Sequence, residues 1–204
     1  MLYNNITNYP ICAIITKMSI FYTRKGDKGQ SYVGKKSVSK TCVEVEALGQ
    51  LDELNSMIGV VKSLPRAESR GQKISSALKF TLHQVQEDLF IVQSHVANLM
   101  LGGSFKVPGF NKSKVKNIEN IIDGIERKLP PLKKFVISGA NQASAWLDFL
   151  RAKSRNVERS VLRINKSDKL DLEVKKYLNR LSSLFFALAR WEARSKKEKN
   201  PQYK

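Results

Sequence analysis

The sequence predicts an all-α protein, an up-and-down bundle of five helices built as a single domain. Apolar residues recur at alternating steps of four and three along five segments, which places one apolar stripe on each predicted helix. The segments between them are short or contain proline and glycine, and no stretch shows a convincing β alternation or an internal repeat. Such stripes bury well only against other helices, so a helical bundle is the expected architecture.

The first two predicted helices span residues 43–64 and 74–101, separated by a connection that begins at Pro65 and includes Gly71. Proline and glycine both disfavour the interior of a helix, which supports a break at this point. The stripe of the first helix consists of Ala47, Leu51, Leu54, Ile58 and Val61. The stripe of the second consists of Leu78, Leu82, Val85, Leu89, Val92, Val96 and Leu99.

The last three predicted helices span residues 112–128, 142–164 and 170–195, and breakers at 102–108 and 130–139 precede the first two of them. The stripe of the third helix consists of Val115, Ile118, Ile122, Ile125 and Leu129. That of the fourth consists of Ala143, Leu147, Leu150, Ser154, Val157, Val161 and Ile164. That of the fifth consists of Leu170, Val174, Tyr177, Leu181, Leu184, Leu188 and Trp191.

The charge balance is unusual for a chain of this size. Lys and Arg total 36 against 18 acidic residues, a formal net charge of +18. Such a charge attracts nucleic acid, anionic lipid or a polyphosphate substrate, and a solvated lysine-rich surface accounts for most of it. The longest apolar runs, residues 11–15 and 184–189, are too short to span a membrane. The two cysteines, Cys12 and Cys42, provide no disulfide framework and favour a reducing, cytoplasmic location.

The domain boundaries follow from the first motif and the end of the last helix. We expect residues 1–17 to be a dispensable N-terminal extension, because Met18 directly precedes the first sequence motif, which begins near residue 21. Residues 18–196 are expected to form the helical domain, and residues 197–204 a basic C-terminal tail.

Residues 21–40 do not fit a bundle helix, because they are rich in glycine, lysine and arginine. Glycines allow backbone N–H groups to approach a ligand closely, and the basic side chains supply charge-assisted hydrogen bonds, as a phosphate-binding loop requires. Within this stretch residues 29–36 resemble a Walker A loop, but Lys36 occupies the place of the magnesium-binding Ser or Thr. We therefore do not expect a true P-loop, and composition alone leaves a flexible basic segment equally open.

The fourth predicted helix carries a second, charged stripe beside its apolar one, formed by Asp148, Arg151, Arg155 and Glu158, with Arg159 adjoining it. This stripe lies only about 100° from the apolar stripe, near the bundle interior. Two arginines one turn apart, with acids on either side, can hold a phosphate chain and its metal. The alternative is a solvated, salt-bridged helix face.

Several other chemistries are excluded by residue content. His83 and His95 are the only histidines, twelve residues apart on one predicted helix, so a di-iron set with Glu-x-x-His pairs is absent. No Cys–His arrangement has the spacing of a metal site, and no nucleophile elbow is present.

Six sequence blocks occur in the order of a known family and together span about residues 21–191. They are 22–29 (YTRKGDKG) with 38–40 (VSK), 48–55 (LGQLDELN), Leu89–Phe90, 129–135 (LPPLKKF), Arg151 through Glu158 and Arg159, and 176–182 (KYLNRLS). This chain resembles the PduO-type ATP:cob(I)alamin adenosyltransferases. Any one block would be a weak signal, whereas six in order with compatible spacing are highly specific.

The resemblance implies a fold, a reaction and an assembly. The fold would be a helical bundle of ferritin-like topology, assembled as a homotrimer with active sites between subunits. The reaction would transfer the 5′-deoxyadenosyl group from ATP to the cobalt of cob(I)alamin, with Mg²⁺ as cofactor and triphosphate as the leaving group. A reductase and an adenosylcobalamin-dependent enzyme would be further partners, and no nucleic acid or membrane would be involved.

The resemblance also assigns roles to residues at matching positions. Those implied to line ATP are Thr23, Arg24, Lys25, Gly26, Ser31 and Lys40 from the loop, and Arg155, Glu158, Arg159 and Asn179 from the helices. Glu158 would also organise Mg²⁺. Arg151 would pair with Asp52 of a neighbouring subunit, and Phe135 would occupy the lower face of the corrin and exclude its axial base.

The chain departs from the family pattern at two places, one beside the residues implied to bind phosphate and one in the loop after Phe135. The family usually reads RRAER where this chain has Asn156 after Arg155, so one positive charge beside the phosphates is lost. The usual PGG after the aromatic residue is replaced by residues 138–140 (SGA), which leaves the loop conformation near the corrin open.

Two competing functions are weighed against the enzyme. A basic helical bundle could bind nucleic acid, but the sequence contains no recognised base-reading module. A catalytically idle homologue could store or hand on cobalamin, and the retention of Arg151, Arg155, Glu158 and Asn179 argues against it.

Overall fold

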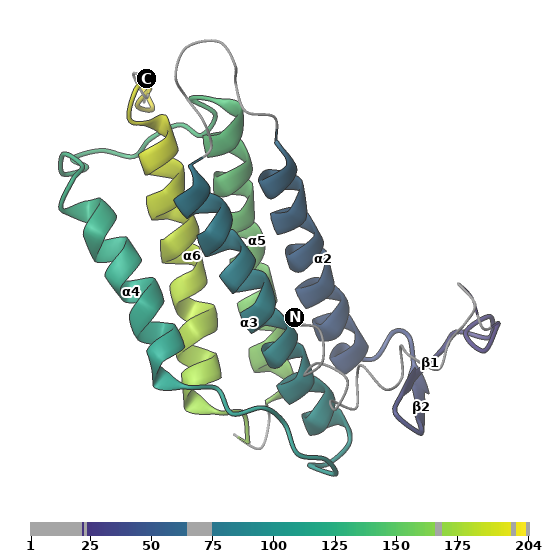
Figure 1. The fold of residues 1–204 in the computed structure, drawn as a ribbon. Coiled ribbons are helices and arrows are strands. Elements are labelled where there is room, and N and C mark those ends of the chain that lie inside the picture. The colour runs from purple at the N-terminus through teal and green to yellow at the C-terminus, as the bar shows by residue number, and fades with distance from the viewer. Residues whose placement is uncertain (1–21, 23, 65–74, 166–168, 197–198, 203–204) are drawn as a thin grey trace.

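The computed structural model describes residues 22, 24–64, 75–165, 169–196 and 199–202. Within these ranges the chain forms five long helices, as predicted, and Figure 1 shows them side by side in a bundle. Their bounds are α2 (Val43–Ser63), α3 (Ser76–Met100), α4 (Lys112–Glu126), α5 (Gln142–Ile164) and α6 (Leu172–Ala193). Each predicted helix agrees with an observed one to within two residues at either end. The predicted extension 1–17 and the candidate residue Thr23 lie outside the described residues.

The helices pack so that α5 and α6 form the centre of the bundle. Helix α5 packs against α6 and α2, α6 also packs against α4, and α2 packs against α3. The start of α5 is tied to the end of α6, because the Asn141 side-chain amide donates a 2.8 Å hydrogen bond to the backbone carbonyl of Glu192. The same side chain caps α5 by accepting from the Ser144 N–H. These contacts are consistent with the expected up-and-down arrangement.

The core consists of the predicted apolar stripes. Leu51, Leu82, Val157 and Leu181, one from each of four helices, are fully buried. On α4 the stripe is shorter, since Val115 and Ile118 are buried while Ile122 and Ile125 are only partly covered. Thus α4 covers the bundle with the N-terminal half of its stripe and leaves the C-terminal half at the surface.

A short hairpin ahead of α2 was not predicted. Strands β1 (Gln30–Val33) and β2 (Lys36–Ser39) pair antiparallel around the two-residue turn Gly34–Lys35. Gly34 has φ 59, a left-handed conformation at the first turn position that glycine adopts without strain. The strands are short and mostly polar, so their alternation is too weak to be recognised in the sequence.

The hairpin is joined to the bundle at the end of α3. The Lys36 ammonium donates a 3.0 Å hydrogen bond to the carbonyl of Met100, the last residue of that helix. Figure 1 shows the hairpin extending away from the helices, on the opposite side from α4. Each helix in the described part of the chain is too short or too polar to cross a membrane.

Candidate active site

The charged stripe of α5 runs from the interior to the surface along the helix. Asp148 is buried, Arg151 and Glu158 are half-buried, and Arg155 and Arg159 are exposed. The stripe therefore adjoins the core at its N-terminal end, as its angle to the apolar stripe indicated. Further along the helix it offers charged side chains to a ligand.

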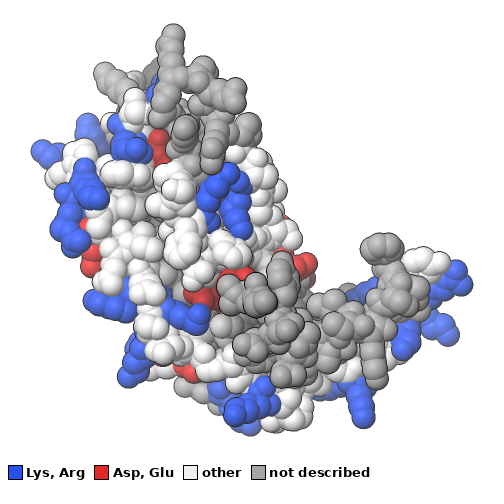
Figure 2. All heavy atoms as spheres, in the orientation of Figure 1, with Lys and Arg blue, Asp and Glu red and all other residues white. Residues whose placement is uncertain are grey.

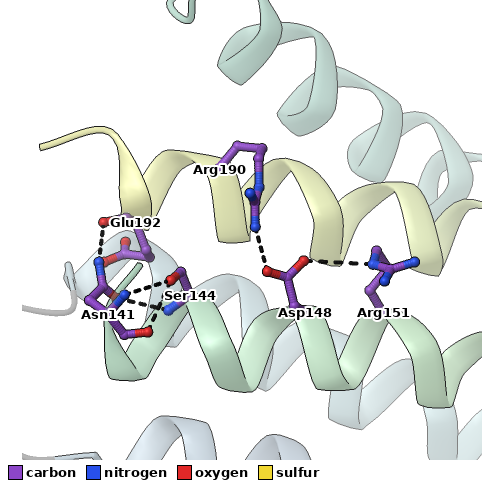
Figure 3. A network of polar contacts seen from close by, with 6 residues as sticks. All are labelled: Asn141, Ser144, Asp148, Arg151, Arg190 and Glu192. Atoms are coloured by element: carbon purple, nitrogen blue, oxygen red, sulfur yellow. Dashed lines mark hydrogen bonds and ion pairs between the residues drawn. The ribbon is translucent and has the colours of Figure 1, made fainter. Parts of the chain in front are cut away.

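Asp148 is held between two arginines (Figure 3). One carboxylate oxygen binds the guanidinium of Arg190 on α6, and both side chains are about 95% buried. The other oxygen lies 3.6 Å from Nε of Arg151, one turn further along α5. Because a buried carboxylate is costly without a counter-charge, the Arg190 guanidinium compensates Asp148, and the more exposed Arg151 lies further from it.

Glu158 belongs to a second group of polar contacts. Its Oε1 accepts a 3.0 Å hydrogen bond from the side-chain amide of Asn179 on α6. The amide oxygen of Asn179 accepts a 2.7 Å hydrogen bond from Arg180, whose Nε lies 3.0 Å from Glu119 on α4. Two predicted site residues, Glu158 and Asn179, are therefore in direct contact across the α5–α6 interface.

A groove runs between α4, α6 and the segment that follows α4. It encloses about 960 Å³, and both Arg151 and Arg155 line it beside Phe186 and Leu132. A second hollow of about 810 Å³ shares Leu132, Arg151 and Phe186 with the groove and adds Phe135 and Asp148. Three of the predicted residues, Arg151, Arg155 and Phe135, therefore line two adjoining hollows, and Arg151 belongs to both.

Phe135 projects from the segment between α4 and α5 and is 79% exposed. The backbone of this segment is attached to the C-terminal tail. The Phe135 carbonyl accepts from the Asn200 side chain at 2.8 Å, and the Ile137 N–H donates to the Lys199 carbonyl at 2.8 Å. An aromatic side chain this exposed in an otherwise tethered segment is available to pack against a flat ligand.

The predicted loop residues form a compact turn that leads into the hairpin. Arg24 has φ 59, a left-handed conformation that is uncommon for a residue other than glycine, and strained backbone of this kind is concentrated at functional sites. Gly26 lies against Lys40, since a Cβ added to Gly26 would come within 2.9 Å of the Lys40 Nζ. Ser31 lies in β1, and Lys25, like Arg24 and Lys40, is exposed. The turn thus collects cationic groups around Gly26, where a larger residue would displace the end of the Lys40 side chain.

The structure does not bring this turn to the groove within one chain. The turn and its hairpin lie on the opposite side of the bundle from α4, which lines the groove (Figure 1). Asp52 is exposed on α2, and its neighbour Glu53 pairs with Lys153 of α5. The acidic side chain that lies beside Arg151 is Asp148, also on α5. The predicted site residues therefore divide into a loop half and a helix half.

The positive charge of the chain is distributed rather than gathered in one patch on the face seen in Figure 2. Lys and Arg side chains appear along the side of the bundle formed by α4, at its lower edge and on the hairpin, and a few acidic side chains lie among them over the bundle. On this face the basic side chains are therefore spread over the surface.

Two ionisable groups with shifted pKa values lie outside the predicted site residues. Burial raises the pKa of Tyr177 well above its usual value, and the nearby Asp88 carboxylate adds to the shift. Burial also raises the pKa of Glu192, against the opposing effect of Arg194. Both groups lie on α6, and neither is among the residues predicted to form the site.

Sequence reasoning missed Arg190, Arg180 and Glu119. Arg190 interrupts a run of mostly apolar residues near the end of α6, and a lone charge among residues predicted to be buried signals a partner elsewhere in the chain. No comparable signal marks Arg180 or Glu119, because their importance depends on which residues of other helices they contact.

Among the described residues, no group of three or more His, Cys, Asp or Glu side chains is arranged to hold a metal ion. A dedicated cage of protein ligands is therefore not seen in this part of the chain. Glu158 is the acidic side chain closest in sequence to the two exposed arginines, and Asn179 donates to one of its two oxygens.

Comparison with known proteins finds one family. The family model described as Cobalamin adenosyltransferase matches residues 21–192. The Corrinoid adenosyltransferase of Bacillus subtilis is 36% identical over 169 residues, which are 83% of this chain and 84% of the relative. The Corrinoid adenosyltransferase MMAB of Bos taurus is 35% identical over 190 residues, 91% of this chain and 76% of the relative.

Solved structures give the same result. A Phe-to-Ala variant of the PduO-type ATP:corrinoid adenosyltransferase from Lactobacillus reuteri, complexed with cobalamin and ATP, superposes with a TM-score of 0.80. It is 27% identical in sequence, and the superposition covers 90% of this chain and all of that one.

Proposed function

The chain belongs to the cobalamin adenosyltransferase family, and from this premise we propose how its residues carry out the reaction. The enzyme transfers the 5′-deoxyadenosyl group of ATP to the cobalt of cob(I)alamin, giving adenosylcobalamin and triphosphate. Co(I) supplies the electron pair that forms the Co–C5′ bond, and the C5′–O bond breaks with its electrons leaving on triphosphate. The protein has to align the two substrates and neutralise the charge that develops on the leaving group.

The helix half of the site supplies the groups that bind the triphosphate. Arg155 and Arg159 are exposed cations on α5, and Glu158 and Asn179 lie beside them in mutual contact. The single observation that carries this proposal is that Arg151 lines both the groove that contains Arg155 and the adjoining hollow that contains Phe135. This arrangement offers charge for the phosphates and an apolar wall for the corrin on adjoining surfaces.

Glu158 would hold Mg²⁺ together with phosphate oxygens of ATP. Mg²⁺ is usually bound through one or two carboxylates plus substrate phosphates and water, and it seldom uses a cage made only of protein ligands. One available carboxylate beside exposed arginines fits that pattern. When bound, the ion would neutralise charge on the triphosphate.

The loop half would reach ATP from a neighbouring copy of the chain. Thr23, Arg24, Lys25, Gly26, Ser31 and Lys40 would contact ATP from there, and Asp52 would pair with Arg151 across the same interface. The separation of hairpin and groove within one chain, together with the exposure of Asp52, supports this arrangement. A homotrimer with three such interfaces is the proposed assembly.

Location and further partners complete the proposal. A cytoplasmic location is supported by the sparse use of cysteine and by the partly exposed free thiol of Cys42. The reaction needs cobalt in the Co(I) state, so a reductase must supply the electron, and an adenosylcobalamin-dependent enzyme is the natural recipient of the product.

The test is anaerobic turnover of chemically reduced cobalamin with ATP and Mg²⁺, followed through the loss of Co(I) absorbance. We expect an ATP-dependent, light-sensitive alkylcobalamin and one released triphosphate per turnover. A folded protein that binds cobalamin without converting it would instead be a carrier, and the assignment of catalytic roles would be wrong.

Replacing Gly26 by alanine tests the loop half. The added Cβ would meet the Lys40 ammonium at 2.9 Å and the Gln30 carbonyl at 3.3 Å, so Lys40 must move. Because the displaced atom is the end of a flexible side chain, stability should hardly change. We expect KM for ATP to rise about fivefold, roughly the loss of one net hydrogen bond, with KM for cobalamin unaffected.

The matched control is Gly124→Ala, on α4, where an added Cβ meets nothing within 4 Å. Alanine there should improve the helix slightly and leave both KM values unchanged. Equal effects of the two substitutions on ATP would exclude the proposed contact of Lys40 with ATP.

Replacing Phe135 by alanine tests the lower face of the corrin. The side chain is 79% exposed, so its removal should cost little stability. We expect adenosylation that starts from cob(II)alamin and a reductant to slow roughly tenfold or more, because the axial base is no longer excluded and reduction becomes harder. Turnover of fully pre-reduced cob(I)alamin should fall much less.

The spectroscopic signature is the electron paramagnetic resonance signal of cob(II)alamin without a lower ligand, which the Phe135→Ala variant should no longer produce. Phe80→Ala, at another strongly exposed phenylalanine on α3, is the control. If Phe135→Ala slowed the reactions that start from cob(II)alamin and from cob(I)alamin equally, Phe135 would not control the coordination of cobalt.

A further inference from the structure

A line of four polar side chains connects α4, α6 and α5. Glu119 of α4 accepts a 3.0 Å hydrogen bond from Nε of Arg180, and NH1 of Arg180 donates a 2.7 Å hydrogen bond to the amide oxygen of Asn179. The amide nitrogen of Asn179 then donates a 3.0 Å hydrogen bond to Oε1 of Glu158 on α5. The line therefore ends at two residues that the proposed function gives to ATP.

The chemistry of the neighbours defines the orientation of the Asn179 amide. Arginine has only donors, and an ionised carboxylate has only acceptors. The oxygen of the amide must therefore face Arg180, and its NH₂ group must face Glu158. The oxygen and nitrogen of an asparagine amide are commonly assigned from such neighbours, and here both ends agree on one assignment.

Contacts at both ends hold the amide more firmly than either contact alone. If only Glu158 remained, an exposed Asn179 side chain could pivot about that single hydrogen bond. Arg180 removes this freedom because its planar guanidinium binds Glu119 through one nitrogen and Asn179 through another. Glu119 in turn keeps the guanidinium in place. Both side chains are partly buried, with 41% of Arg180 and 34% of Glu119 exposed.

We propose that Arg180, held by Glu119, is a positioning residue that orients Asn179 and through it Glu158 for ATP. This inference rests on the proposed role of Asn179 and Glu158 at the triphosphate. Arg180 acts through Asn179 and is not assigned a contact with either substrate.

The direction in which Glu119→Gln changes ATP affinity separates a positioning role of Arg180 from a simple charge effect. If Arg180 acted only as a positive charge near ATP, Glu119→Gln would remove a nearby negative charge and strengthen ATP binding. If Arg180 acts by position, Glu119→Gln loosens its anchor and weakens ATP binding. The substitution is nearly isosteric, so the folded state is retained.

The experiment measures ATP affinity by calorimetry and both KM values for Arg180→Met, Arg180→Lys and Glu119→Gln in the full chain. We expect Arg180→Met to weaken ATP binding about tenfold with KM for cobalamin unchanged. Arg180→Lys should restore little, because a single ammonium nitrogen replaces the two guanidinium nitrogens that bridge Glu119 and Asn179. Lys116→Met, which removes an exposed cation on α4, is the control and should change neither value.

A double-mutant cycle with Asn179→Ala gives the sharpest readout. Because Arg180 acts through Asn179, Arg180→Met should add almost nothing in the Asn179→Ala background. Additive effects, or tighter ATP binding by Glu119→Gln, would overturn the proposal.

The outcomes also separate this inference from the proposed function. If Glu158→Gln and Asn179→Ala weaken ATP binding while Arg180→Met does not, only the positioning role fails. If Glu158→Gln and Asn179→Ala also leave ATP binding intact, the helix half of the proposed site is wrong and the positioning role fails with it.

Discussion

Replacing Arg155 by alanine is expected to lower kcat by roughly 10²–10³-fold, the cost of removing one strong donor that stabilises a developing negative charge. Arg155 is exposed on α5, lines the groove and lies three residues before Glu158. In the proposed site its guanidinium contacts the triphosphate, whose charge increases as the C5′–O bond breaks. Stability should be unchanged, because no part of the core depends on this side chain.

The measurement is anaerobic single turnover of cob(I)alamin with saturating ATP, which separates the chemical step from binding. Arg155→Lys is the informative companion, since it keeps the charge and loses the planar fork that can bind two phosphate oxygens. We expect it to recover only part of the rate. Unaltered turnover in Arg155→Ala would contradict the prediction and would mean that the triphosphate is stabilised by groups other than Arg155.

Replacing Arg190 by methionine is expected to lower the free energy of unfolding by about 3–5 kcal/mol. The substitution leaves Asp148 buried, with its nearest remaining cation, Arg151, at 3.6 Å. A buried carboxylate without a strong counter-charge is among the most destabilising defects that one substitution can produce. For a domain of this size the loss corresponds to a Tm lower by roughly 2–4 °C per kcal/mol.

Urea denaturation of wild type and variants, compared at equal protein concentration, checks this expectation. The double variant Asp148→Leu with Arg190→Met should recover most of the loss, because a buried ion pair replaced as a whole by apolar side chains is often close to neutral. A loss below about 1 kcal/mol for Arg190→Met alone would contradict the expectation and would mean that Asp148 is solvated, as in a surface ion pair.

The two predictions concern different functions of one helix. Asp148 joins α5 to α6 inside the bundle, whereas Arg155, two turns further along, offers its charge to solvent. Arg151 lies between them and belongs to both the buried cluster and the groove. Substitutions at Arg151 are therefore expected to affect stability and activity together, unlike those at Arg155.

The sequence alone determined the helices, their boundaries and most of the core. These properties depend on local periodicity, so Leu51, Leu82 and Leu181 could be assigned to the interior from their spacing to neighbours three and four residues away. The charged stripe of α5 was found in the same way. The family was recognised from six blocks in order, and the comparisons confirm it.

Tertiary structure alone decided which of these residues meet. Asp148 and Arg190 are 42 positions apart, and Glu119 and Arg180 are 61 apart, so no local pattern could pair them. The β1–β2 hairpin was missed for the opposite reason, because its strands are too short and polar for a periodic signal. The hairpin also places the loop half of the site away from the groove, which the spacing of residues along the chain could not show.

The physical reason for this division is the range of the interactions. Helix formation and amphipathic spacing are decided within one or two turns of chain, and a sequence records them directly. Paired charges, an oriented amide and a groove arise only when separate helices pack at a definite angle and register, and those are properties of the whole bundle.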